Sequence, residues 1–402
     1  MQSMLKTYFD DLEQSLRKKL ENKVTPRRKF IHEIARIGCK MFDPQWATAW
    51  TTVFVPFEIL EAMGISGMFI EFIGAMLAGA NMSKPYFESA EQLGYSTDGC
   101  SYHRTIIGAA EKQLFPEPDL LIGSSCPCFG GVKAIQRLGD FYNKKFFVLN
   151  PPINDTPSDV DYFVNQYEKM IEHIENATGR TLSDNKLKRA MKCNNESRKY
   201  LLEAYEYCKQ VPSPSNSNDF KNFIIFALLS GIPEGVEVAK VYRDDLARRV
   251  ENGIQGVPGE KHRLLWVQNR IQFKNDLIEI LEQQYKANVV IDELNYIYWE
   301  EMDELDPLRS IAIRQIKNPI LGPVDRRMKY IVKMAKEFKI DGAINPAHWG
   351  CRQSSGAKAM FKDTLQKIGI PLIHLDVDCV DERNFSKGQI LTRLEAFMEL
   401  LA

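Results

Sequence analysis

The sequence lacks an excess of charge of either sign. It contains 52 Lys and Arg against 53 Asp and Glu over 402 residues, a formal net charge of −1. Proteins that bind nucleic acid or an anionic membrane through their overall field carry a clear basic excess. We therefore expect neither partner, and any charged ligand must be bound by a local site.

Long hydrophobic runs are also missing. The longest apolar stretch, FIEFIGAMLAGANM from Phe69, is interrupted by Glu71 and is too short to span a bilayer. The first residues, MQSMLKTYFDDLEQSLRKKLENK, spread acids and bases through an amphipathic pattern and lack the apolar core of a signal peptide. The sequence thus predicts a soluble, cytoplasmic protein.

Cysteine is sparse, and no compact C-x2-C pair marks a zinc or ferredoxin site. Eight cysteines over this length are too few for a disulfide scaffold, so in a reducing compartment they are free thiols, metal ligands or catalytic groups. Cys39 has apolar neighbours, and Cys193 and Cys208 lie in helical patterns, which favours structural roles. Acidic neighbours would raise the pKa of Cys379 and make it a poor ligand.

Short apolar runs alternate with helical periodicity in two parts of the chain. Examples are DLLIGSSC, KKFFVLNPP, HRLLWVQN and PLIHLDVDC, and this alternation is typical of parallel sheets flanked by helices. We predict an α/β protein with two Rossmann-like lobes. The expected divisions are an N-terminal helical arm (1–45), a first α/β lobe (46–156), a helical segment (157–255) and a second α/β lobe (256–402).

Three cysteines lie in loops beside small or turn-forming residues: Cys100 in STDGCSYHR, Cys128 in SSCPCFGG and Cys351 in HWGCRQSSG. The last two follow predicted strands, and ligands of open parallel sheets gather at the carboxyl ends of strands. A cleft between the lobes would bring the loops together. Spacing alone leaves other interpretations open: unrelated turn cysteines, a zinc or thiol protein, or one catalytic cysteine with His103 or His348 as its base.

Several long segments resemble the 2-hydroxyacyl-CoA dehydratase and benzoyl-CoA reductase family. They include AWTTVFVPFEILEAMG, GYSTDGCSYHRTIIGAAE, DLLIGSSCPCFGGVKAIQRLGDFYNKKFFVLNPP and DGAINPAHWGCRQSSGAKAMF, in this order along the chain. The resemblance implies a [4Fe–4S] cluster on three cysteines, which correspond to Cys100, Cys128 and Cys351. It leaves Cys126 as a possible extra ligand.

The resemblance also implies candidate catalytic residues. Glu71 matches an active-site acid of the family. His103 is expected to donate to cluster or substrate, and Arg104 to pair with Glu71 or a CoA phosphate, with a structural salt bridge as the alternative. Val53 occupies a position where a catalytic dehydratase subunit can have a serine.

The activity implied is one-electron, ketyl-radical chemistry on an acyl-CoA thioester, foremost 2-hydroxyacyl-CoA dehydration in an oxygen-sensitive enzyme. The implied partners are a related or identical second subunit and a separate ATP-hydrolysing iron–sulfur activator, which fits the lack of a G-x-x-x-x-G-K-[ST] motif here. The alternatives are a benzoyl-CoA-reductase-type subunit and an electron-relay subunit without its own substrate. A double-cubane cluster on six cysteines is disfavoured, because no cysteine lies between Cys208 and Cys351.

Overall fold

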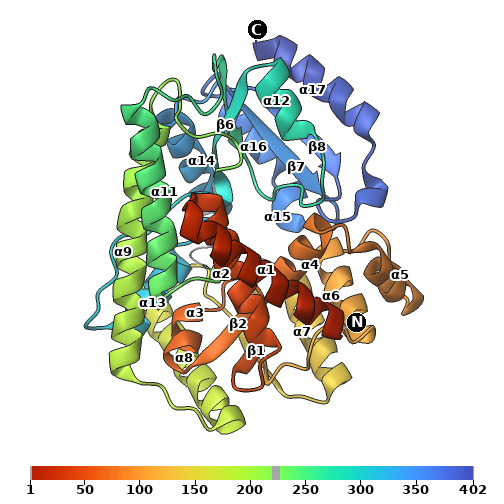
Figure 1. Ribbon diagram of the computed structural model, residues 1–402, viewed down its shortest axis with the longest axis vertical. Helices are drawn as coiled ribbons and strands as arrows, with labels where there is room; N and C mark the ends of the chain where they lie inside the picture. The colour runs from red at the N-terminus through yellow and green to blue at the C-terminus, as the bar shows by residue number, and fades with distance from the viewer. Residues whose placement is uncertain (1, 220–226, 402) are drawn as a thin grey trace.

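Two four-stranded parallel sheets form the framework of the protein. The computed structural model describes residues 2–219 and 227–401 (Figure 1). The first sheet has the order β2-β1-β3-β4, from β1 (Ala47–Thr51), β2 (Ile65–Phe69), β3 (Leu120–Ser124) and β4 (Phe146–Leu149). The second repeats this order as β6-β5-β7-β8, from β5 (His262–Trp266), β6 (Ala287–Asp292), β7 (Gly342–His348) and β8 (Leu372–Val377).

Burial explains why these segments form parallel strands. Every residue of β2, β3, β6 and β7 is buried, as expected when helices cover both faces of a sheet. The predicted α/β fold with two lobes is therefore confirmed. Strand β1 ends at Thr51, the chain turns at Phe54 (φ 70°), and the apolar residues Phe57–Ala62 form helix α3.

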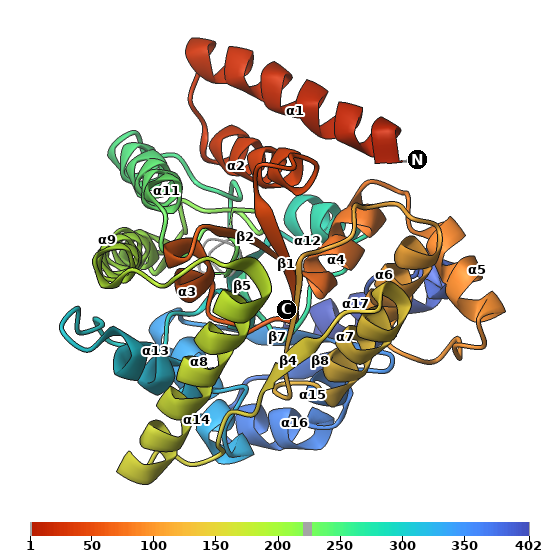
Figure 2. The same cartoon turned by 90° about the horizontal axis from the view of Figure 1, so that it is seen from below.

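Helices of the first lobe follow each strand. They are α3, α4 (Ile70–Gly79), α5 (Lys84–Gln92), α6 (Ser101–Glu111) and α7 (Phe129–Tyr142). The N-terminal arm consists of two helices, α1 (Gln2–Asn22) and α2 (Pro26–Met41), which lie as an outer layer on this lobe (Figure 2). Thr25 caps α2 through the Arg28 N–H, with Pro26 in the first turn, so the sequence itself separates the two helices.

Three long helices, α8 (Pro157–Thr178), α9 (Asp184–Cys208) and α11 (Pro233–Glu251), occupy the region predicted to be helical. A capping box between Thr156 and Asp159 starts α8, and Gly179 ends it in a left-handed conformation. Helices α9 and α11 lie side by side (Figure 1), and α8 packs against β4 and α13. The strands fall inside the two predicted lobes, whereas the exact domain boundaries stay a prediction.

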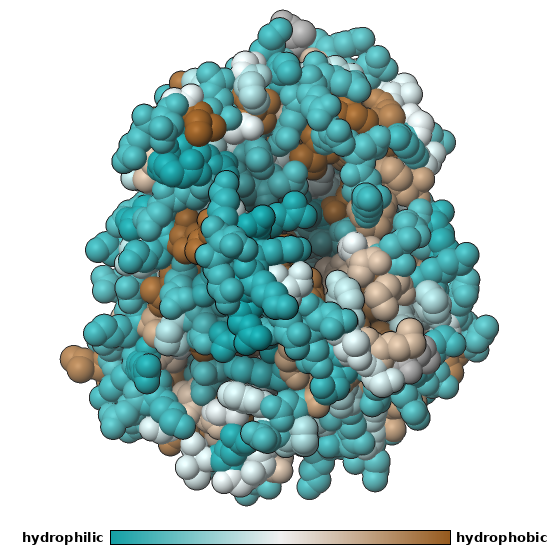
Figure 3. All heavy atoms as spheres, viewed as in Figure 1, coloured by the Kyte–Doolittle hydropathy of each residue, from teal (hydrophilic) through white to brown (hydrophobic). Residues whose placement is uncertain are grey.

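The second lobe carries the remaining helices. They are α12 (Leu277–Gln284), η1 (Glu293–Asn295), α13 (Pro307–Ile316), α14 (Val324–Glu337), α15 (Arg352–Ser355), α16 (Lys358–Gln366), η2 (Glu382–Asn384) and α17 (Lys387–Leu401). Among the helices of the described residues, none is both long and apolar enough to cross a membrane. The face in Figure 3 is mostly hydrophilic, with hydrophobic side chains in scattered places.

The two lobes are joined by shared packing and by a buried ion pair. One hydrophobic cluster contains Trp50 of β1 together with Leu265 of β5. Glu58 on α3 is fully buried and pairs with Arg314 on α13. Burial opposes ionisation of Glu58, but the Arg314 guanidinium holds the pKa of this carboxyl below its usual range.

Replacing Arg314 should strongly destabilise the fold. Arg314→Met leaves the Glu58 carboxylate buried without its cation, which costs about 3–5 kcal/mol of unfolding free energy. Because the folded pKa of Glu58 lies below its unfolded value, the wild-type advantage is complete above an unfolded pKa of about 4.3. It is lost as the pH falls through the folded pKa. Urea unfolding of the wild type and of Arg314→Met, from about pH 7 downward, measures the difference in their unfolding free energies.

Arg309→Met is the matched control on the same helix. Arg309 is exposed and pairs with Asp161 and Asp306 at the surface, so its replacement should cost at most about 1 kcal/mol. Equal effects of the two substitutions would contradict a stabilising role for the buried pair.

Candidate functional site

Cys100, Cys128 and Cys351 each occupy the residue immediately before a helix. Cys100 precedes α6, Cys128 precedes α7 and Cys351 precedes α15. None of the three side chains caps its own helix with a hydrogen bond. The amide groups at the starts of α6 and α7 stabilise negative charge, so thiolates at these positions are favoured.

Loops of the second lobe touch both cysteine loops of the first lobe. Gly350 has a φ of +70°, and a Cβ atom there would lie 2.6 Å from the Cys100 backbone nitrogen, so only glycine fits this approach. The Gln353 side chain donates a hydrogen bond to the Pro127 carbonyl at 2.9 Å. The carboxyl ends of the two sheets therefore meet at the three cysteines, as the sequence predicted.

The Cys351 thiol lies close enough to Cys100 and Cys128 for their charges to affect its pKa. Burial raises the pKa of the Cys351 thiol, His348 opposes this, and the negative charges of Cys100 and Cys128 add to the rise. At Cys100, burial also opposes ionisation, but His103 and His348 lower the thiol pKa to about 5. Cys100 is thus a thiolate at neutral pH.

No group of three His, Cys, Asp or Glu side chains in residues 2–219 and 227–401 is placed to hold a single metal ion. A zinc site needs such a convergence of ligands on one ion. The zinc interpretation left open by the sequence therefore finds no ligand set in the part of the chain that the structure describes.

Glu71 and His103 form a pair beside the cysteines. The imidazole Nε2 of His103 lies 3.3 Å from Oε1 of Glu71, and the backbone N–H of Val53 donates to Oε2 of Glu71 at 3.1 Å. Burial opposes protonation of His103, but Cys100 and Glu71 raise its pKa well above the ordinary value. The structure thus brings together the two residues that the sequence singled out.

Gly130 allows His103 to lie close to Cys128. A Cβ atom at Gly130 would be 3.2 Å from the Cys128 Sγ and 3.2 Å from the His103 Nδ1. Both atoms therefore border Gly130, and His103 interacts with the Cys100 thiol as well as with Glu71. The histidine therefore links the acidic residue to the cysteine site.

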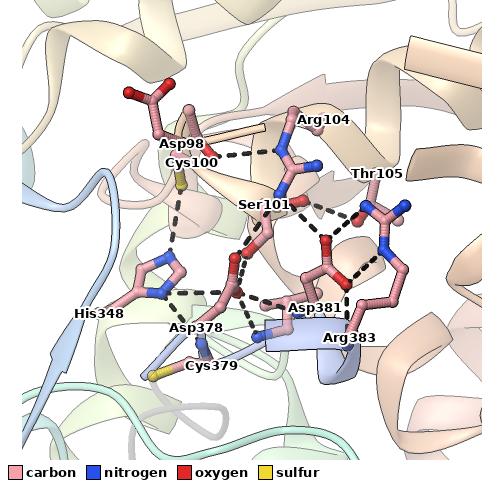
Figure 4. Close-up of polar contacts among 12 residues, drawn as sticks. Asp98, Cys100, Ser101, Arg104, Thr105, His348, Asp378, Cys379, Asp381 and Arg383 are labelled. Carbon is pink, nitrogen blue, oxygen red and sulfur yellow. Dashed lines mark hydrogen bonds and ion pairs between the residues drawn. The ribbon is translucent and has the colours of Figure 1, made fainter. Parts of the chain in front are cut away.

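Arg104 has a different environment from the one expected. Its side chain is 2% exposed and binds Asp381 at 3.2 Å (Figure 4). It also binds Glu91 at 2.8 Å, rather than Glu71. Its Nε donates to the carbonyl of Gly99, next to Cys100. The expected pairing with Glu71 was wrong, and the geometry supports the structural salt bridge that joins the lobes.

His348 and Asp378 are site residues whose arrangement the sequence did not reveal. His348 Nε2 lies 3.8 Å from the Cys100 Sγ, and its Nδ1 accepts a hydrogen bond from the Cys379 backbone N–H at 3.0 Å (Figure 4). A backbone N–H can only donate, so the proton of a neutral ring resides on Nε2 and points at the Cys100 sulfur. Asp378 accepts from Ser101, next to Cys100, which fixes the second lobe against α6.

The sequence contained one signal for this network. The acids in HLDVDCVDE follow a strand, at the end of a sheet where functional groups gather. From the sequence alone, these acids predicted only a raised pKa for the Cys379 thiol. That thiol is buried, and burial is the main reason its pKa is raised.

The remaining cysteines lie apart from this network. Burial raises the pKa values of Cys39 and Cys208 to about 12, and it also raises that of Cys193, as expected for structural thiols. Cys126 is half-buried, and burial raises its pKa while the Ser125 hydroxyl lowers it. No contact in the described residues joins the Cys126 thiol to the other site cysteines, so its role as an extra ligand stays a prediction.

A cavity adjoins the Glu71–His103 pair. It has a volume of about 100 Å³ and lies between the loop after β1 and the region from η1 to α13. Val53, whose N–H binds Glu71, lines this cavity, and so does Glu293. Glu293 binds Arg327, which in turn contacts the carbonyl of Gln353 beside Cys351. The cavity is therefore connected to the cysteine loops through these side chains, while neither Glu71, His103 nor any of the three cysteines lines it.

Comparisons with known proteins place these residues in context. A family model described as 2-hydroxyglutaryl-CoA dehydratase, D-component, matches residues 52–401. The (R)-phenyllactyl-CoA dehydratase alpha subunit of Clostridium sporogenes is 27% identical over 88% of this chain and 89% of that protein. The (R)-2-hydroxyisocaproyl-CoA dehydratase alpha subunit of Clostridioides difficile is 25% identical over 88% and 89%. A benzoyl-CoA reductase subunit of Thauera aromatica is 23% identical over 78% of each chain.

Arg104→Met should destabilise the protein rather than act on chemistry directly. It leaves the carboxylates of Asp378 and Asp381, both fully buried, without this cation, at a cost of about 3–5 kcal/mol. Lys358→Met, which removes an exposed pair with Asp376, should cost at most about 1 kcal/mol. Urea unfolding monitored by circular dichroism distinguishes the two variants. Unchanged stability of Arg104→Met would reject the structural role.

Proposed function

Because the chain belongs to the 2-hydroxyglutaryl-CoA dehydratase D-component family, we propose that it dehydrates a 2-hydroxyacyl-CoA thioester with a [4Fe–4S] cluster held by Cys100, Cys128 and Cys351. The observation that carries this proposal is the convergence of three cysteines, each at the start of a helix, from two lobes onto one site. The overall reaction removes the hydroxyl from C2 and a hydrogen from C3 as water, leaving an enoyl-CoA.

The donor set fits such a cluster. Each thiolate of a cubane binds a different iron, so the three sulfur atoms need not converge on one ion. The low pKa of Cys100 and the amides at the starts of α6 and α7 favour an anionic group at this place. His348 Nε2 beside the Cys100 Sγ supplies a hydrogen bond of the kind that tunes cluster potentials. When bound, the cluster would supply one-electron chemistry to the thioester.

The protein residues then handle the proton and position the substrate. His103 holds a proton at Nε2 against Glu71, next to the cavity lined by Val53. This pair can donate a proton to the departing hydroxyl, which must leave as water. The backbone N–H of Val53 donates to the Glu71 carboxylate and so orients it. This contact does not need a serine hydroxyl at position 53.

The same residues support the alternative functions less well. A reductase subunit of the benzoyl-CoA type is supported by one relative, but that relative covers a smaller share of the chain than the two dehydratases. An electron-relay subunit has no need of a cavity beside Glu71 and His103. A single catalytic cysteine would not explain why Cys128 and Cys351 share the site with Cys100.

We further propose a second subunit and a separate activator. The two dehydratase relatives are named as alpha subunits, which supports a related or identical partner chain for this protein. An iron–sulfur activator that hydrolyses ATP would supply the electron. The enzyme would be sensitive to oxygen, since a low-potential cluster is easily oxidised.

The decisive experiment is anaerobic purification followed by iron and sulfide analysis and EPR. A subunit holding one cubane should contain about four irons and four sulfides per chain. Mixing it with partner, activator, ATP and reductant should dehydrate a 2-hydroxyacyl-CoA. Turnover of benzoyl-CoA alone would move the assignment to a reductase, and activity without iron would indicate a thiol enzyme.

Cys351→Ser is expected to abolish cluster binding. Serine lacks the thiolate, and the remaining two cysteines leave the cubane with too few ligands. Cys193→Ser is the matched control, because that cysteine is only partly buried and lies on α9, away from the site. The iron and sulfide contents of both variants are to be measured. A full cluster in Cys351→Ser would refute the ligand assignment.

Glu71→Gln should slow dehydration without loss of the cluster. The amide keeps its size and can accept from Val53 N–H, but it no longer stabilises the protonated His103. A general acid contributes about 10²- to 10⁴-fold to kcat, and the variant should lose the part of this that depends on a protonated His103. The pH profile of kcat should lose its alkaline limb at a lower pH than in the wild type, because the pKa of His103 falls. An unchanged profile with unchanged iron content would argue against this pair.

A further inference from the structure

Each sheet carries a glutamate at the same point of its carboxyl edge. In the first lobe, Glu71 follows β2 and accepts a hydrogen bond from the backbone N–H of Val53, just beyond the end of β1. In the second lobe, Glu293 follows β6 and accepts at 3.0 Å from the backbone N–H of Gln268, just beyond the end of β5. Because the two sheets have the same strand order, the two glutamates occupy equivalent positions.

The partners of the two glutamates differ. Glu71 contacts the imidazole of His103, whereas Glu293 binds the guanidinium of Arg327 through both of its oxygens. The Nε of Arg327 lies 2.5 Å from Oε1 of Glu293, and its Nη2 lies 2.8 Å from Oε2. An arginine stays charged in proteins, and its planar fork fits a carboxylate in one geometry. Glu293 therefore holds Arg327 in a fixed orientation.

Arg327 also contacts the loop of Cys351. Its side chain is 2% exposed, and Nη1 donates to the carbonyl of Gln353, the second residue after Cys351, at 2.7 Å. Nη2 donates in addition to the side chain of Gln268, and the guanidinium lies over the Phe361 ring, 4.6 Å from its centroid. Since every nitrogen of the guanidinium has a partner, the carbonyl of Gln353 meets a buried donor whose direction is set.

The side chain of Gln353 extends to the first lobe. Its Nε2 donates to the carbonyl of Pro127 at 2.9 Å, and Pro127 directly precedes Cys128. The Nη1 of Arg327 lies 3.5 Å from Oε1 of Gln353, so the amide presents its oxygen to the cation and its NH₂ group to the carbonyl. One side chain thus ties the loop of Cys351 to the loop of Cys128.

We propose that Arg327 and Gln353 form a clamp that fixes these two cysteine loops at the separation required by a shared iron–sulfur cluster. Both are positioning residues, because they act on the cluster only through Cys128 and Cys351. Residues that orient metal ligands from outside the ligand set typically contribute about 10- to 100-fold to metal affinity. The cluster in this inference rests on the proposed function, whereas the clamp is a property of the two loops.

Gln353→Leu removes the amide that crosses between the lobes and keeps a side chain of similar size. Amide hydrogen exchange of residues 126–131 and 349–355, measured before iron loading, should become about five- to tenfold faster in both segments, the effect of one lost hydrogen bond. Loss of iron from the loaded protein to a chelator should become about 10- to 100-fold faster. Gln366→Leu is the matched control, because Gln366 is exposed at the end of α16, and it should leave both rates unchanged.

Arg327→Lys tests the other half of the clamp. Lysine keeps a charge beside Glu293, but its single terminal nitrogen cannot reproduce the fork that binds Glu293 and the Gln353 carbonyl together. Loss of iron should become at least about tenfold faster, and the EPR signal of the reduced cluster should shift, as it should in Gln353→Leu. Arg326→Lys on the same helix, whose side chain pairs with Asp155, should keep the wild-type rate and signal.

The outcomes distinguish the clamp from the proposed function. Unchanged amide exchange in Gln353→Leu, or iron loss equal to that of the two controls, would overturn the clamp. Faster iron loss with an unaltered EPR signal and a lower urea midpoint would indicate general destabilisation, and would overturn it too. If Gln353→Leu does not fold by circular dichroism, Arg327→Lys decides by the same measurements. If the wild type itself binds no iron, the proposed cluster fails, and amide exchange alone decides whether the clamp exists.

Discussion

The structure depends on the contact between the carboxyl ends of two parallel sheets. Each sheet alone exposes at this edge the loops that follow its strands, and the site exists only where the two edges meet. A network of buried charges maintains the contact: Arg104 from the first lobe reaches Asp378 and Asp381 from the second. The Ser101 hydroxyl adds a hydrogen bond to Asp378. These residues flank Cys100, so lobe closure and the position of this thiol are set by the same contacts.

Local pattern was sufficient for the framework and for part of the site. Apolar strands with helical segments between them predicted both sheets, because parallel strands covered on two faces are apolar throughout. The same reasoning located Cys128 and Cys351 after strands. The resemblance singled out Glu71 and His103 separately, and the structure adds their contact, which bridges 32 residues within one lobe.

The contacts between the lobes could not be predicted from local sequence pattern. For Arg104 the sequence left Glu71, a CoA phosphate and a structural salt bridge as alternatives, and its partner Asp381 is 277 residues away. Glu58 and Arg314 are separated by 256 residues, and nothing in FEILEA or SIAIRQ marks either as a member of a buried pair. Such pairs follow from how the lobes dock, and docking is decided by the whole surface rather than by periodicity.

The order of the cysteines along the chain has a consequence for biogenesis. Cys100 and Cys128 belong to the lobe that is synthesised first, whereas Cys351 follows β7, which pairs with β8 near the end of the chain. N-terminal units generally fold first during synthesis. Any group shared by the three thiols can therefore be inserted only after the chain has been synthesised beyond Cys351 and both lobes have folded, so the cell must protect a folded but empty protein until that step.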